Sequence, residues 1–317
     1  IKARIVKQLR YRLLHWQVIM SKKGSGLVDD IVLLKLRYSG IQAPQFQRLI
    51  HAYPNFLSFS EYDLLNLLSK TEIKKWFGDI AAQYKRISED YILTSLYDAS
   101  VKFITINSQC YSTLLKEIYD FPPILFYRGD ISLLNSNTTL AVVGSRKATS
   151  YSYKALDFLF SQFNRRFTIV SGLAKGADSM AHELAIQHHH ATIAVLGFGH
   201  LAHYPKETYI LRQKIEAHHL SISEYLPFEP VTKYHFPQRN RLISGISKGV
   251  LITEAEKRSG SQITIAHALD QNRNVYVLPG DLFNPLTQGN LYRAREGACI
   301  VTGAEDILMD YDINKVF

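Results

Sequence analysis

The spacing of hydrophobic residues differs between the two parts of the chain. From residue 27 to about residue 96, apolar residues recur at intervals of three and four, the spacing of amphipathic helices, and strand patterns are scarce. The segments 60–63 and 69–72 both match capping boxes, in which a serine oxygen accepts from free N–H groups at a helix start and a carboxylate follows three residues later. The pattern predicts a small all-helical domain over residues 27–98.

Beyond residue 98, short β-branched and apolar runs alternate with segments of helix length. The predicted strands cover residues 101–106, 124–127, 140–143, 167–170, 192–196, 221–223, 250–253, 274–278 and 299–301. Regular alternation of strands and helices is typical of an α/β fold with a mostly parallel sheet and helices on both faces. We predict one such domain over residues 99–317.

The segment 139–176 reads as a strand-helix-strand unit in which both strands end in small polar residues. Gly144, Ser145 and Arg146 follow the first strand, and Ser171 and Gly172 end the second. Loops after parallel strands gather at one edge of the sheet, beside helix N-termini whose free N–H groups attract anions. Glycine lets a phosphate approach the backbone, and arginine offers two parallel donors to it. This edge is therefore predicted to bind a polyanion.

Three further segments are predicted to reach the same edge. Lys206 lies at the start of a helix predicted over residues 205–217, and the segment 234–241 joins aromatic residues to an Arg-Asn-Arg run. Arginines supply donors for phosphates and an aromatic ring supplies a stacking surface for a base. Two alternatives stay open at this point: Phe236 serves only as a core anchor, or Asn240 only caps its own helix. Ser259-Gly260-Ser261 repeats the small polar turn before another helix.

Several enzyme and metal motifs are present only in part. The segment 197–202 matches a dinucleotide-binding fingerprint, but Pro205 falls where the required helix would continue. Lys175 and Gly176 resemble a P-loop without its Ser or Thr, and the His182-Glu183 pair lacks the second histidine of a zinc protease. No serine has an evident His and Asp partner. We therefore predict no catalytic residues, no metal and no cofactor.

Composition adds the class of partner. The formal net charge is +9 and the pI is near 9.3, which favours nucleic acid or a nucleotide, although solubility alone would also explain such a charge. Two cysteines far apart in sequence fit a reducing, cytoplasmic setting rather than a disulfide framework. The sequence contains no run of about 18 apolar residues, so no membrane span is predicted. Residues 1–26 are interpreted as a basic extension outside the fold.

Taken together, the motifs resemble the DNA-processing protein A family, also called Smf, of bacterial natural transformation. The resemblance rests on VVGSR (142–146), SGLAKGAD (171–178), YPK (204–206), SEY (223–225), FPQRNRLISG (236–245), EAEKRSGSQIT (254–264), LPG (278–280) and REGA (295–298). It implies an extended Rossmann-like domain that binds single-stranded DNA, protects incoming strands and helps to load the RecA recombinase for homologous recombination during competence. It also implies a homodimer, and it likens residues 27–98 to a sterile-alpha-motif-like (SAM-like) domain.

The resemblance also assigns roles to individual positions. Phosphate or DNA ligands would be Arg146, Lys206, Arg239 and Arg241. To these we add Lys175 as a DNA-binding residue, and we expect Phe236 to stack on a base. The pocket would be shaped by Ser145, Ser171, Gly172, Gly176, Asn240, Ser259, Gly260 and Ser261, which offer N–H or hydroxyl groups. Ala177 stands where an isoleucine is usual, and Asn272-Arg273-Asn274 replaces a common Gly-Arg pair. Both departures leave the pocket chemistry intact.

Two alternatives belong to other classes of protein. The first is a nucleotide-hydrolysing enzyme of phosphoribohydrolase type, which needs a carboxylate beside the sugar. The segment 259–266 lacks the glutamate of that family's motif, but Glu254 and Glu256 are close in sequence. The second is a purely structural scaffold, which would leave four converging polar loops without a purpose.

Overall fold

A computed structural model describes residues 26–311, and the predicted extension over residues 1–26 falls almost entirely outside this range. Its centre is a nine-stranded sheet in the order β1-β2-β6-β5-β4-β3-β7-β8-β9. The strands are β1 (Lys102–Thr105), β2 (Ile124–Gly129), β3 (Thr139–Val143), β4 (Thr168–Ser171), β5 (Ala191–Val195), β6 (Leu220–Ser223), β7 (Gly249–Ile252), β8 (Asn274–Val277) and β9 (Cys299–Ile300). From β6 to β9 all neighbours are parallel, whereas β1 and β2 pair antiparallel and extend the sheet. The predicted α/β fold with a mostly parallel sheet is confirmed.

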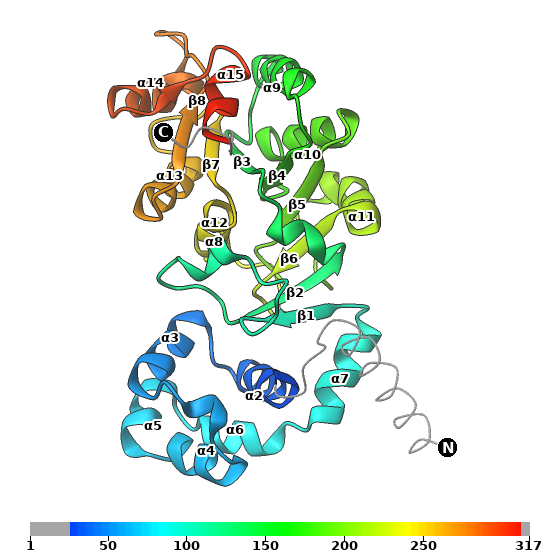
Figure 1. Cartoon of the computed structure of the whole chain (residues 1–317), viewed down its shortest axis with the longest axis vertical. Helices are drawn as coiled ribbons and strands as arrows, with labels where there is room; N and C mark the ends of the chain where they lie inside the picture. The colour runs from blue at the N-terminus through cyan, green and yellow to red at the C-terminus, as the bar shows by residue number, and fades with distance from the viewer. Residues whose placement is uncertain (1–25, 312–317) are drawn as a thin grey trace.

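The helices form two groups. The first group is α2 (Gly26–Tyr38), α3 (Ala43–Ala52), α4 (Glu61–Leu68), α5 (Thr71–Phe77), α6 (Ile80–Arg86) and α7 (Glu89–Asp98). The second is α8 (Thr113–Lys116), α9 (Ser150–Gln162), α10 (Ala177–Gln187), α11 (Tyr209–His218), α12 (His235–Gly245), α13 (Gly260–Asp270), α14 (Gln288–Arg295) and α15 (Glu305–Leu308), with 3-10 turns at Phe56–Ser58, Ile131–Asn135, Lys206–Thr208, Pro285–Thr287 and Met309–Tyr311. In Figure 1 the first group gathers at one end of the molecule beside β1, and α14 and α15 lie at the opposite end. No described helix is long and apolar enough to cross a membrane.

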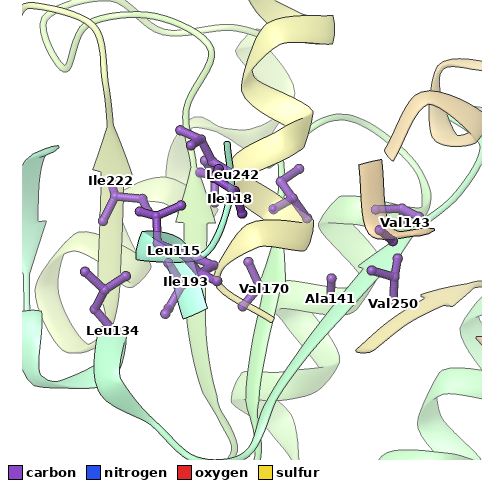
Figure 2. Close-up of a cluster of buried hydrophobic side chains, with 14 of the residues drawn as sticks. Leu115, Ile118, Leu134, Ala141, Val143, Val170, Ile193, Ile222, Leu242 and Val250 are labelled. Carbon is purple, nitrogen blue, oxygen red and sulfur yellow. The ribbon is translucent and has the colours of Figure 1, made fainter. Parts of the chain in front are cut away.

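Helices cover both faces of the sheet, as the alternating pattern predicts. On one face, α12, α13 and the segment around α8 pack on strand side chains, and Figure 2 shows Leu115 and Leu242 beside Val170 and Ile193. On the other face, α9 and α10 pack through Leu156, Phe160 and Leu184. Strands buried on both faces read as continuous apolar runs, which explains why β3 to β7 are visible in the sequence.

The helical region packs directly on the sheet. One hydrophobic cluster joins residues of α2 to α7 with Ile124 and Phe126 of β2 and with Leu226. Arg37 at the end of α2 pairs with Glu229 at 2.6 Å. The predicted boundary between residues 98 and 99 lies in the turn between α7 and β1, yet the two regions share one core.

Local signals succeed at some helix ends and fail at others. Ser60 caps α4 as predicted, because its Oγ accepts from the backbone N–H of Asp63 at 3.2 Å. The second predicted capping box is wrong: Ser69 ends α4, its hydroxyl donates to the carbonyl of Leu65 at 2.7 Å, and Lys70 precedes α5. The helix predicted from residue 205 begins as the 3-10 turn Lys206–Thr208 and becomes α-helical only at Tyr209.

Candidate nucleic-acid interface

Loops that follow β3, β4 and β7 meet at the carboxyl edge of the sheet. The backbone N–H of Ser145 donates to the carbonyl of Glu254 at 2.6 Å, and the carbonyl of Ser145 accepts from the N–H of Ala177 at 3.1 Å. The hydroxyl of Ser261 donates to the carbonyl of Gly144 at 2.7 Å. The three loops are therefore tied to one another by hydrogen bonds, and α10 and α13 direct their N-termini to this edge.

Gly176 is required by this close approach. It precedes α10 with a φ of +76°, and a Cβ atom there would lie 2.5 Å from the carbonyl oxygen of Ser145. A side chain at this position is thus excluded by both conformation and space. By contrast, a Cβ atom on Gly260 at the start of α13 would meet nothing within 4 Å, so this helix N-terminus is open to a ligand.

A small depression of about 40 Å³ lies beside these loops. It is lined by Arg146, Gly172, Ala174, Lys175, Tyr204, Pro205, Phe236 and Arg239. The exposed guanidinium of Arg146 lies over the ring of Phe236, with 5.8 Å between its Cζ and the ring centroid. The ring of Tyr204 lies 5.7 Å from that of Phe236 and is 46% exposed. A cation and two aromatic rings therefore share one surface.

Arg239 forms the floor of the depression. It is buried, and its Nη1 donates to the carbonyl of Gly172 at 2.7 Å and to that of Val195. Its Nε donates to the side chain of Asn240 at 3.2 Å, whereas its Nη2 has no hydrogen-bond partner among the described residues. One amino group is thus left for a ligand in the depression.

A buried carboxylate accompanies this arginine. Asp178 at the start of α10 accepts from the N–H of Ala174 at 3.2 Å. Burial raises the pKa of Asp178, an effect that the charge of Arg239 opposes, and burial likewise lowers the pKa of Arg239, opposed by Asp178. The opposite charges of Asp178 and Arg239 therefore favour each other's ionised form beneath the depression. Sequence reasoning missed Asp178 as a supporting residue, although it closes the SGLAKGAD motif.

The two lysines of the edge differ in their surroundings. Lys175 is exposed and forms an ion pair with Glu207, whose pKa is lowered by that hydrogen bond. Lys206 is also exposed and has no ion pair within the described part of the chain. A polyanion would find the charge of Lys206 free, whereas it would have to compete with Glu207 for Lys175.

Most predicted residues come together at this edge, but three serines are not simple hydroxyl donors. The hydroxyl of Ser171 donates to the carbonyl of Val142 and that of Ser261 donates to the carbonyl of Gly144, both at 2.7 Å. The Oγ of Ser145 accepts from the N–H of Lys147 at 3.0 Å. These residues fix the loops. The side chain of Asn240 donates to the carbonyl of Gly260 at 3.4 Å, so it joins α12 to α13 rather than capping α12.

Arg241 does not belong to the edge, and the predicted role as a phosphate ligand is corrected here. It is buried on the opposite side of α12, between Asp120 and Glu224, with 2.7 Å from its Nε and its Nη2 to the two carboxylates. Burial alone would lower the pKa of Arg241, but the two carboxylates outweigh this effect and raise it. Arg241 therefore ties α12 to the segment before β2 and to the end of β6.

The remaining partial motifs lie in surroundings that differ from those that their chemistry requires. Gly197 and Gly199 are followed by turns and not by a helix, which rules out the dinucleotide fingerprint there. The carboxylate of Glu254 is fully buried and accepts from the N–H of Thr149 at 2.7 Å and from the hydroxyl of Ser152 at 2.7 Å. It holds the start of α9, where Thr149 is the N-cap residue, and is closed to a substrate. No group of metal-ligating side chains occurs within residues 26–311.

Known proteins share both the sequence and the fold. Over 208 residues the chain is 41% identical to DNA processing protein DprA of Streptococcus pneumoniae, covering 66% of this chain and 73% of the relative. It is 39% identical over 219 residues to DprA of Bacillus subtilis, covering 68% and 73%. The X-ray structure of DprA from S. pneumoniae superposes with a TM-score of 0.78 at 34% identity, over 87% of this chain and 95% of that one.

A second solved structure, DNA processing protein A from Helicobacter pylori, is described by its single-stranded DNA binding mode. It superposes with a TM-score of 0.58 at 26% identity, over 67% of this chain and 96% of that one. The family model for DNA recombination-mediator protein A matches residues 102–312. Because this match spans about two thirds of the chain, the chain belongs to the DNA recombination-mediator protein A family.

Proposed function

We propose that this protein binds single-stranded DNA at the carboxyl edge of its sheet. The observation that carries the proposal is the pairing of exposed Arg146 with the ring of Phe236 above a floor formed by Arg239. Arginine can hold a backbone phosphate while a base stacks on an aromatic ring, and this combination is typical of proteins that bind single strands. The single-stranded DNA binding of the H. pylori relative supports the same assignment.

Binding of this kind reads the backbone and not the sequence. Each phosphate that a cation neutralises contributes about −0.7 to the slope of log affinity against log salt for a single strand. The free charges at the edge include Arg146 and Lys206, with one amino group of Arg239 below them. We therefore expect affinity that falls steeply with salt and only slight preference for a duplex, whose bases are not available for stacking.

The direct test is fluorescence anisotropy of a labelled oligonucleotide at several salt concentrations. Arg146→Ala should weaken binding to all single strands and make the salt slope shallower by about 0.7. Arg86→Ala is the matched control, because Arg86 is exposed at the end of α6, far from this edge in sequence and fold. Equal salt slopes for the Arg146 variant and the parent protein would exclude the edge as the DNA site.

We propose further that binding serves natural transformation, with the protein protecting incoming strands and loading RecA in the cytoplasm as a homodimer. Family membership supports this role. A RecA filament assay on DNA covered by single-strand-binding protein tests loading, and light scattering tests the dimer. A monomer that still binds DNA but never accelerates RecA assembly would separate binding from loading and refute the second part.

We infer a binding role without a catalytic step. The phosphoribohydrolase alternative needs a carboxylate that can touch a sugar, and Glu254 is buried and occupied by Thr149 and Ser152. Glu256 is exposed, but it does not line the depression. Incubation with nucleoside monophosphates, followed by chromatography for released base, checks this inference, and any release that Glu256→Gln abolishes would contradict it.

A further inference from the structure

A larger cavity, of about 300 Å³, lies between the helical region and the sheet. Its walls come from the start of α3, the segment before β2, the end of β6, and one side each of α12 and α13. This is the volume range in which small organic ligands bind to proteins. It is separate from the depression at Arg146, since the two share no lining residue.

The cavity offers hydrogen-bond acceptors at its charged end. Asp120 and Glu224 each use one carboxylate oxygen to bind Arg241. The second oxygen of each carboxylate accepts from no described residue, and both side chains line the cavity. Arg37 lines the cavity as well and pairs with Glu229 outside it, so the two guanidiniums and two carboxylates of the lining balance in charge. The unused carboxylate oxygens remain as acceptors for an N–H donor.

The other walls are mostly apolar. They include Pro44, Pro122 and Ile263, with the amides of Gln42 and Gln238 at exposed positions. A largely apolar body that carries an amine group fits both kinds of wall. Among the parts of a nucleic acid, this describes a base with an exocyclic amine, because carboxylates accept from the amine of cytosine.

Helix α12 connects the cavity to the DNA edge. Phe236 and Arg239 line the depression, whereas Pro237, Gln238 and Arg241 line the cavity. Both Pro237 and Gln238 are exposed, so the first turn of α12 separates the two sites by about the width of one helix, roughly 10 Å. A strand held at Arg146 can cross this turn within one or two nucleotides, since an extended single strand advances several ångströms per nucleotide.

We propose that the cavity is a base-recognition subsite for the bound single strand, selective for an amine-bearing base such as cytosine. The proposal rests on the proposed function, because the strand reaches the cavity from the phosphate-binding edge. It gives the helical region a direct share in DNA recognition through α3. It also predicts a base preference in a protein whose other contacts, to phosphates and to the face of a stacked base, do not distinguish one base from another.

The test compares an all-dT oligonucleotide with the same oligonucleotide that carries one central dC. The parent protein should bind the dC version about 10-fold more tightly, the discrimination that one good base contact supplies. Asp120→Asn should remove this preference while leaving affinity for all-dT unchanged, since an amide can turn a donor toward the amine. Asp120 is 34% exposed in its side chain, so the substitution should not prevent folding.

Two further variants make the result specific. Gln42→Trp should block the exposed rim of the cavity and remove the same preference by a different route. Asp98→Asn makes the same chemical change at an exposed position at the end of α7 and should keep the preference.

Each remaining outcome decides the matter. Equal affinity of the parent protein for the two oligonucleotides, or a dC preference that survives Asp120→Asn and Gln42→Trp, overturns the subsite and leaves the proposed function standing. Failure of the parent protein to bind any of the oligonucleotides would overturn both the proposed function and the subsite.

Discussion

Glu254 provides the sharpest test of how the DNA edge is held together. Its fully buried carboxylate accepts from the backbone N–H of Thr149 at 2.7 Å, from the hydroxyl of Thr149 at 2.9 Å and from the hydroxyl of Ser152 at 2.7 Å. Its own carbonyl accepts from the N–H of Ser145 at 2.6 Å. This one residue therefore fixes both the start of α9 and the loop that carries Arg146.

The substitution Glu254→Gln keeps the size of the side chain but replaces one acceptor oxygen with an NH₂ group. That group would face an N–H or hydroxyl donor, so one or two hydrogen bonds to a charged acceptor are lost, at about 1.5–3 kcal/mol each. We expect the free energy of unfolding to fall by roughly 2–4 kcal/mol. For a protein of this size class the Tm should drop by about 5–10 °C.

Thermal unfolding followed by circular dichroism measures this effect, and Glu256→Gln is the control. Glu256 lies two residues further along, is exposed, and should leave the Tm within about 1 °C of the parent value. Equal Tm values for the Glu254 variant and the parent protein would refute the structural role. The same result, combined with loss of a nucleotide-cleaving activity, would favour the enzymatic alternative.

Three other outcomes follow from buried groups. Gly172→Ala would place a Cβ 2.4 Å from a buried guanidinium nitrogen and should cost about 1–3 kcal/mol in urea unfolding, whereas Gly260→Ala, with nothing within 4 Å, should be neutral or slightly stabilising. Burial lowers the pKa of His182 to about 3, so this side chain stays neutral in the folded protein, whereas in the unfolded chain it takes up a proton below about pH 6.5. The free energy of unfolding should therefore fall by roughly 2–3 kcal/mol between neutral pH and pH 4.5. Denaturant titrations of His182→Asn should show a weaker pH dependence. Arg241→Met should lower stability by about 3–5 kcal/mol and leave the salt slope of DNA binding unchanged, whereas Arg146→Ala should do the reverse, as anisotropy and calorimetry would show.

The strands and their loops were predictable because each buried strand is an apolar run that ends at a small polar residue. Gly144 and Gly172 marked the edge correctly for this reason. The different directions of the Arg239 and Arg241 side chains were not predictable in the same way. Residues two apart on a helix lie about 200° from each other around its axis, so the pair faces opposite sides of α12.

Partners distant in sequence explain the other differences. The acceptors of Arg241 are Asp120 and Glu224, which only the fold brings to it. Ser69 has the residue type of a helix start, but packing of α4 decides that it ends one helix instead of starting the next. A sequence motif names the residues of a site, whereas the direction of each side chain depends on how the elements pack.

The hydrophobic cluster shared by the helical region and the sheet limits how these two regions can change independently. Phe126 is fully buried on β2, within a cluster that also holds Leu34 and Leu64 from the helices. Removing the helical region would turn this strand face into an exposed apolar patch, with the tendency to aggregate that such patches carry. The boundary near residue 98 therefore separates two sequence patterns, but we expect the two regions to unfold together as one cooperative unit. If the helical regions of two relatives were exchanged, the buried side chains of β2 that contact them would have to be exchanged as well.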